Sequence, residues 1–267
     1  MNSETPTHPE ANAIEMRGVA LGAMRDQSVT VAEDINWTVN AGEFWVVAGP
    51  QRSGKSDLLM LTGGLMPPAR GMYHFFGEEM PIFEEERLAE RLRLGLVFDG
   101  GQLFNRMTIA ENVALPLRYH KNLSRAEAEG RVAAMLELTE LTPLANSTPG
   151  AVARNWQKRA GLARALILEP EVLLLDDPLV GLDARHAFWW MNFLGGLSRG
   201  QNSPHGKPTT IVATAVDLSR SVEWRAHARR IACLVQKRLV VFGDWPEVER
   251  SDDATVRDLL YAQPTRN

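Results

Sequence analysis

The residues Gly-Pro-Gln-Arg-Ser-Gly-Lys-Ser at positions 49–56 restrict the possible fold more than any other part of the chain. They have the spacing of a phosphate-binding loop, in which a glycine and four further residues precede Gly-Lys-Ser. Such a loop joins a β-strand to an α-helix, whose amino end points its positive dipole at the phosphates. Apolar residues at 44–48 and 57–62 supply the expected strand and helix, so a chance match in a glycine turn is a weak alternative.

Each residue type in this loop has a chemical purpose. The glycines let backbone N–H groups turn inward and approach phosphate oxygens closely. Lys55 adds a positive charge for the β- and γ-phosphates, and Ser56 offers a hydroxyl to Mg²⁺. The predicted cofactors are therefore ATP and Mg²⁺. The residues predicted to bind the nucleotide are Gly49, Pro50, Gln51, Arg52, Ser53, Gly54, Lys55, Ser56 and Asp57.

A second motif lies at residues 172–177, where an apolar run of Val and Leu ends in Asp176 and Asp177. In P-loop ATPases an aspartate at the end of such a strand reaches the Mg²⁺ shell, so Ser56 and Asp176 are the predicted metal ligands. Asp177 stands where a water-polarising carboxylate would lie, and it is the predicted catalytic residue. An ordinary strand followed by an Asp-Asp-Pro turn is the alternative, and the phosphate loop makes it the weaker one.

Short apolar runs alternate with helical patterns along the chain, which favours a largely parallel α/β sheet. The predicted fold class is α/β, a P-loop NTPase with a RecA-like parallel core and an antiparallel β side layer. Two extended stretches near residues 14–16 and 29–39 are assigned to the side layer, and residues 238–242 to a late hairpin strand. The predicted core strands are residues 44–48, 94–98, 172–175, 210–213 and 231–235.

The strand patterns stop between residues 102 and 165. Ser124 and Glu127 form a capping-box pattern, and apolar residues at helical spacing predict a helix over residues 125–138. We therefore expect one ATPase domain at 13–260, in which a helical subdomain at 100–165 is inserted between core segments 13–99 and 166–250. Residues 1–12 and 261–267 are expected to be flexible tails.

Composition excludes several other classes. A net charge of −4 gives no broad basic surface for nucleic acid. The single cysteine, Cys233, excludes an intramolecular disulfide and lies in an apolar run, which favours a buried structural thiol. The chain shows neither an apolar run long enough to span a bilayer nor the pattern of a signal peptide. Any work at a membrane would then proceed from the cytoplasmic side through a partner.

With these motifs in hand, residues 14–260 resemble the nucleotide-binding subunit of ABC transporters. The supporting landmarks follow in order along the chain: residues 63–67, Gly71, Phe98, residues 103–104, 111–114, 157–160 and 162–165, and Gly181-Leu182-Asp183 after Asp176-Asp177-Pro178. Within the family, residues 98–104 and 112–118 look most like the ATPases of Mce/Mla-type lipid transporters. The resemblance implies that two such subunits dimerise head to tail, each ATP lying between one P-loop and the signature motif of the other subunit.

Several family motifs are altered in this chain. Asp177 stands at the position of the catalytic glutamate, and no aromatic residue appears between Val19 and Ala32 to stack on adenine. Gln102 lies three residues beyond the Q-loop position. The other substitutions are Asp99 for the Q-loop glutamine, Ala153, Arg154 and Asn155 for the signature serine and two glycines, and Ala215 for the switch histidine. A shorter carboxylate arm and lost donors predict slow hydrolysis, with less effect on binding.

Two functions remain open at this point. The first is an ATP-hydrolysing subunit that drives transport through a membrane permease, with lipid as the candidate cargo. The second is a catalytically weak nucleotide-binding pseudo-ATPase that serves a competent ATPase subunit as a structural or regulatory partner. The resemblance implies, as partners, an integral-membrane permease and a second ATPase subunit in a homodimer or heterodimer, and it makes an Mce-like lipid-binding protein a candidate partner. It also implies a peripheral location on the cytoplasmic face of the inner or plasma membrane.

Overall fold

A central sheet of six strands forms the core of the computed structural model, which describes residues 12–80, 85–203, 206–219 and 221–261. The strand order is β10-β9-β3-β8-β7-β6, and all neighbours are parallel except the β9–β10 hairpin. Parallel packing gathers the carboxyl ends of these strands at one edge, where the phosphate loop also begins. The bounds are β3 Phe44–Ala48, β6 Leu94–Val97, β7 Val172–Leu175, β8 Thr210–Ala215, β9 Arg230–Val235 and β10 Arg238–Phe242.

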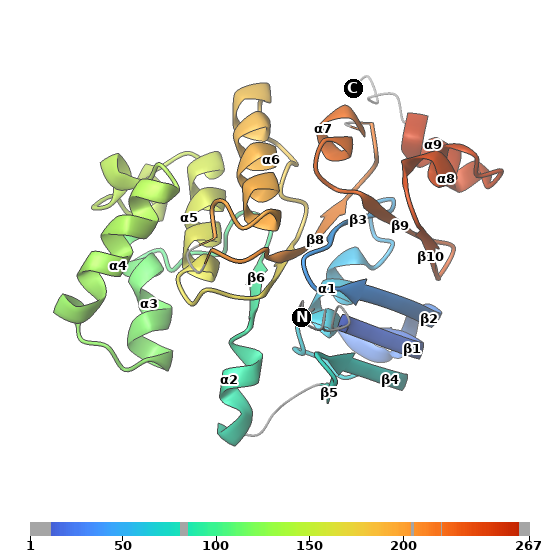
Figure 1. The fold of residues 1–267 in the computed structure, drawn as a ribbon, viewed down its shortest axis with the longest axis horizontal. Helices are drawn as coiled ribbons and strands as arrows, with labels where there is room; N and C mark the ends of the chain where they lie inside the picture. The colour runs from blue at the N-terminus through green and yellow to red at the C-terminus, as the bar shows by residue number, and fades with distance from the viewer. Residues whose placement is uncertain (1–11, 81–84, 204–205, 220, 262–267) are drawn as a thin grey trace, which may run out of the picture.

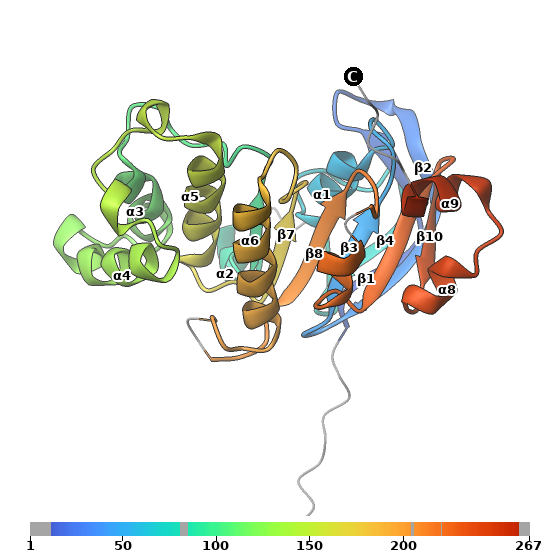
Figure 2. The ribbon, with the colours of Figure 1, turned by 90° about the horizontal axis from the view of Figure 1, so that it is seen from above.

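A second, antiparallel sheet has the order β2-β1-β4-β5 and lies at one end of the molecule (Figures 1 and 2). Side chains alternate across the strands of the central sheet, so that Trp45 and Val47 of β3 face this second sheet. The ring of Trp45 packs edge-on against Trp37 of β2, with 5.6 Å between centroids. The bounds are β1 Asn12–Ala23, β2 Asp26–Asn40, β4 Arg70–Phe75 and β5 Glu78–Glu79.

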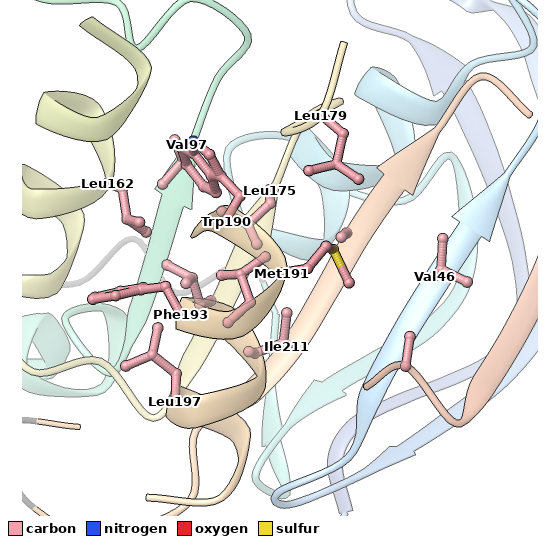
Figure 3. Packing of buried hydrophobic residues seen from close by; sticks show 14 of the residues in the cluster. Val46, Val97, Leu162, Leu175, Leu179, Trp190, Met191, Phe193, Leu197 and Ile211 are labelled. Carbon is pink, nitrogen blue, oxygen red and sulfur yellow. The ribbon is translucent and has the colours of Figure 1, made fainter. Parts of the chain in front are cut away.

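Helices cover both faces of the central sheet. Helix α1 (Lys55–Thr62) buries Leu58, Leu59 and Leu61 on the face shared with the second sheet. Helix α6 (Ala184–Ser198) covers the opposite face, where the apolar side chains that it turns toward β6, β7 and β8 form a continuous core (Figure 3). The carboxyl ends of the strands are thus held by packing on two sides.

A helical lobe lies at the end of the molecule opposite to the second sheet (Figures 1 and 2). It contains α3 (Ile109–His120), α4 (Arg125–Leu138) and the α5 helix (Arg154–Leu166), which returns the chain to the sheet. Reciprocal hydrogen bonds between Thr108 and Glu111 and between Ser124 and Glu127 satisfy the first N–H groups of α3 and α4. The remaining elements are η1 Glu85–Arg87, α2 Leu88–Arg91, η2 Thr142–Leu144, η3 Pro149–Ala151, α7 Ser221–Arg225, α8 Trp245–Glu249 and α9 Ala254–Tyr261.

The predicted fold class is confirmed, and so are the core strands, to within two residues at their ends, and the helix over residues 125–138. The predicted tails are each one residue too long, because Asn12 begins β1 and Tyr261 ends α9. The rest of those tails lies outside the described residues. Within the described part of the chain, no helix combines the length and the apolar character needed to cross a membrane.

Candidate nucleotide site

The phosphate loop has the backbone geometry that its glycines predict. Gly54 adopts φ 97° immediately before α1, a left-handed conformation that disfavours side chains. A Cβ at Gly54 would lie 1.9 Å from Val31 of β2, and one at Gly49 would lie 2.6 Å from the carbonyl oxygen of Leu234. Space is therefore restricted at both glycines, and at Gly54 the backbone conformation disfavours a side chain as well; the loop lies in close contact with β2 and β9.

Lys55 projects from the first turn of α1 into this loop. Its Nζ donates to the carbonyl oxygens of Gly49 at 2.7 Å and Pro50 at 3.0 Å, and only 6% of the residue is exposed. Burial lowers the pKa of the Lys55 ammonium, and the nearby carboxylates of Asp177 and Asp176 oppose that shift. The ammonium thus lies inside the curve of the loop, where a phosphate oxygen could replace a carbonyl as its acceptor.

Ser56 and Asp176, the predicted metal ligands, are brought together. Ser56 Oγ donates to Asp176 Oδ2 at 2.9 Å although 120 positions separate them in the sequence. Hydroxyl and carboxylate oxygens are the hard ligands that Mg²⁺ prefers, and Mg²⁺ is commonly held by one or two protein groups plus phosphates and water. The donor set therefore fits a magnesium ion at the end of β7.

Thr214, which the sequence analysis missed, connects the two aspartates. Its Oγ1 donates to Asp176 Oδ1 at 3.0 Å and accepts from the backbone N–H of Asp177 at 2.9 Å. The residue is fully buried near the end of β8, beside β7 in the sheet. Knowledge of the strand order and register would have revealed it, because Leu175 pairs with Ala213 and the next residues, Asp176 and Thr214, then lie side by side.

Asp177 lies in the same cluster with unusual backbone and electrostatic properties. Its φ is 42°, a left-handed conformation that aspartate tolerates better than most residues. Burial raises the pKa of its carboxyl; the positive charges of Lys55 and Lys158 oppose this, and the negative charges of Asp176 and Asp99 add to it. A higher pKa makes the carboxylate a better proton acceptor.

The remaining predicted nucleotide contacts differ in their surroundings. Gln51 and Arg52 are exposed at the tip of the loop, and Ser53 Oγ is buried without a hydrogen-bond partner among the described residues. A buried hydroxyl of this kind is available to a ligand oxygen. Asp57 instead accepts a hydrogen bond from the backbone N–H of Met24 at 2.7 Å, so its carboxylate fastens the β1–β2 turn to α1.

The altered motifs also find partners inside the chain. Asp99, at the Q-loop position, accepts from Arg154 Nη2 at 2.7 Å, and Asn155 contacts the ring of His186. The carbonyl of Ala215 accepts from the N–H of Gly49 at 3.0 Å. Its methyl side chain borders a cavity of about 240 Å³ that Asp177 also lines. An imidazole at position 215 would occupy that space.

The fold and this cluster define the class of protein: a P-loop ATPase cassette with its phosphate loop intact. The family model described as "ABC transporter" matches residues 32–180. The intermembrane phospholipid transport system ATP-binding protein MlaF of Escherichia coli K12 is 33% identical over 243 residues, which are 89% of this chain and 87% of MlaF. The probable ribonucleotide transport ATP-binding protein mkl of Mycobacterium leprae is 33% identical over 256 residues, 94% of this chain and 70% of mkl.

Solved structures agree. The ATP-binding cassette MJ0796, a dimer in a post-hydrolysis state bound to ADP and Pi, matches with a TM-score of 0.71 and 27% identity over 85% of this chain and 96% of that chain. The cassette cbiO1 from Clostridium perfringens matches with a TM-score of 0.75 at 21% identity, covering 94% and 96% of the two chains, and supports the fold alone. This chain belongs to the ABC transporter family, as an ATP-binding subunit.

Proposed function

We propose that this subunit hydrolyses Mg-ATP slowly and drives a membrane permease that moves lipid. The observation that carries the proposal is the closed cluster of Lys55, Ser56, Asp176, Thr214 and Asp177. It places a cation, a pair of hard oxygen ligands and a partly buried carboxylate around one phosphate loop. The similarity to MlaF, a phospholipid transport protein by its name, supports lipid as the cargo class.

Each residue has a distinct part in this proposal. The backbone N–H groups of the phosphate loop bind the phosphates, and Lys55 neutralises negative charge on the oxygens of the β- and γ-phosphates. Ser56 and Asp176 hold Mg²⁺, which when bound neutralises phosphate charge. Thr214 fixes the Asp176 carboxylate and the Asp177 backbone. Asp177 orients the attacking water and takes its proton, since its carboxyl has a raised pKa.

Two altered residues at or beside this cluster support the proposal of slow turnover. Asp177 has a shorter arm than the family's glutamate, and a misplacement of ~1 Å can reduce a rate by on the order of 10²-fold. Ala215 offers no hydrogen-bonding side chain toward the cavity beside Asp177. Losing a donor to developing charge costs roughly 10²–10³-fold, although such penalties do not simply multiply. Binding is less affected because the phosphate loop is complete.

The dimer partner is the second part of the proposal. Arg154 and Asn155 carry side chains where the family's signature has glycines, so a homodimer would contain two altered signatures. A non-identical ATPase with an intact signature would complete the site formed by this chain's phosphate loop. We infer that such a heterodimer is the more active assembly and that it docks on the permease at the cytoplasmic face of the membrane.

Nucleotide binding is tested with a fluorescent ATP analogue and the purified subunit, with and without Mg²⁺. Lys55→Ala should abolish binding, and Ser56→Ala should reduce the Mg²⁺ dependence while leaving weak binding. Ala215→His serves as the matched control within the site, because it should bind nucleotide as the parent does. Equal affinity of Lys55→Ala and the parent would refute the site assignment.

Hydrolysis is tested on the assembled complex with its permease. We expect a low rate that Ala215→His raises and Asp177→Asn removes. A rate that is undetectable and unchanged by Ala215→His would instead favour the pseudo-ATPase. Fast, transport-coupled hydrolysis by a complex that contains only this ATPase would refute the need for a non-identical partner.

A further inference from the structure

Lys158 on the α5 helix is a buried cation next to the nucleotide site. Its side chain is only 3% exposed. Its ammonium donates to the backbone carbonyl oxygens of Asp177 at 3.0 Å and Val180 at 2.8 Å, with a longer contact of 3.5 Å to that of Pro178. The ammonium thus makes two close hydrogen bonds to main-chain carbonyls of this loop and one longer contact to a third. One side chain of the helical lobe therefore holds the backbone of residues 177–180.

The charge of Lys158 is balanced by Asp99, at the end of β6. The Nζ atom lies 2.9 Å from Asp99 Oδ1, which accepts no hydrogen bond from the described residues, so this contact is an ion pair. The other oxygen, Oδ2, takes the hydrogen bond from Arg154. A buried ammonium without a counter-charge would be strongly destabilising. Asp99 thus supplies the negative charge that allows the Lys158 ammonium to be buried.

The loop that Lys158 holds has a backbone conformation that needs support. Asp177 has φ 42°, a strained conformation that a non-glycine residue keeps only where the surrounding structure fixes it. Thr214 of β8 accepts from its N–H, and Lys158 of the α5 helix donates to its carbonyl, which also accepts from the N–H of Val180 at 3.3 Å. The orientation of the Asp177 carboxylate depends on both.

We propose that Lys158 is a positioning residue for Asp177, that Asp99 is its counter-ion, and that this pair links the helical lobe to the catalytic loop within one chain. The proposal rests on the hydrolytic role proposed above for Asp177. It gives the aspartate at the Q-loop position a definite function in this chain. Displacement of α5 would shift the backbone of residues 177–180 directly, because the link consists of hydrogen bonds to main-chain carbonyls.

The test compares three single variants of the full-length subunit. Lys158→Met removes the ammonium and keeps an apolar stem of similar length. Asp99→Asn keeps the shape of the counter-ion and removes its charge. Arg131→Met is the matched control: Arg131 of α4 pairs with Glu169 at 2.8 Å and contacts the carbonyl of Ile167 at 3.3 Å, away from the nucleotide site. Nucleotide affinity and circular dichroism are measured for all three.

Hydrogen exchange read by mass spectrometry gives a result that does not depend on activity. In Lys158→Met, amides of residues 177–182 should exchange at least tenfold faster than in the parent, with a smaller change in Asp99→Asn and none in Arg131→Met. In the assembled complex, kcat of Lys158→Met should fall on the order of 10²-fold, with KM for ATP within threefold of the parent.

These outcomes separate the two proposals. Unchanged exchange at residues 177–182 in a folded Lys158→Met protein would overturn the link, whatever the rate of hydrolysis. A KM that rises as much as kcat falls would overturn the positioning role, since it would indicate general damage to the nucleotide site. Failure of the parent to hydrolyse ATP would refute the proposed function, and the exchange measurement would still decide whether Lys158 holds the loop.

Discussion

Replacing Thr214 with valine would test the hydrogen-bond network beneath the proposed metal site. The substitution preserves the branched shape of a fully buried residue and removes only its hydroxyl. That hydroxyl makes two hydrogen bonds, to Asp176 Oδ1 at 3.0 Å and from the Asp177 N–H at 2.9 Å. A hydrogen bond to a charged group contributes roughly 1.5–3 kcal/mol, and leaving an amide unpaired costs roughly 1–3 kcal/mol.

Because one hydroxyl serves both contacts, these contributions overlap, and we expect Thr214→Val to lower the free energy of unfolding by about 2–4 kcal/mol. Equilibrium unfolding in urea measures this as a lower midpoint with an unchanged slope. Thr214→Ser is the control, since it keeps the hydroxyl and loses one methyl group. The reasoning fails if Thr214→Val is as stable as the parent, or if Thr214→Ser is destabilised equally.

Three further results are expected. Gly54→Ala should reduce affinity for the ATP analogue at least tenfold, because φ is 97° and the new Cβ would lie 1.9 Å from a side chain of β2; unchanged affinity would contradict the loop geometry. Gly161→Ala should lower the free energy of unfolding in urea by about 1–3 kcal/mol, since the new Cβ would lie 2.6 Å from a backbone atom of residue 101. Gly130→Ala, where the new Cβ meets open space, should instead stabilise α4 by up to ~1 kcal/mol. Burial raises the pKa of Cys233 to about 12. The unfolded thiol therefore ionises first, and the free energy of unfolding should fall as pH rises from ~9 toward 12, by about 2 kcal/mol at pH 10.5 relative to Cys233→Ala.

Local patterns predicted most of the core. The strands at 44–48 and 172–175 coincide with β3 and β7 because short apolar runs in a parallel sheet are buried on both faces. The capping box at Ser124 marked the start of α4 for a purely local reason, the satisfaction of the first N–H groups. The phosphate loop required no tertiary knowledge, since its strand, glycines and helix are consecutive in the sequence.

Contacts across the sheet could not be predicted in the same way. The sequence placed Thr214 just beyond a predicted strand, but only the order β8-β7-β6 shows that its hydroxyl faces Asp176. Lys158 entered the sequence analysis only as part of the landmark at residues 157–160, and its burial against residues 177–180 was not predicted. The contacts of both residues depend on which helices and strands pack side by side, and the local sequence pattern carries little information on this packing.

Asp99 and Arg154 show why an altered motif is a weak argument for lost function. Considered singly, each substitution suggests lost function: Asp99 stands where the family has a glutamine, and Arg154 stands where it has a glycine. In the structure the two side chains are 2.7 Å apart, and Asp99 also pairs with the buried Lys158, so the charge of Arg154 is balanced within the chain. Reverting Asp99 alone to glutamine would leave Lys158 buried without a carboxylate. We therefore expect Asp99→Gln to slow turnover further rather than restore it, and faster hydrolysis by that variant would show that the two substitutions are independent.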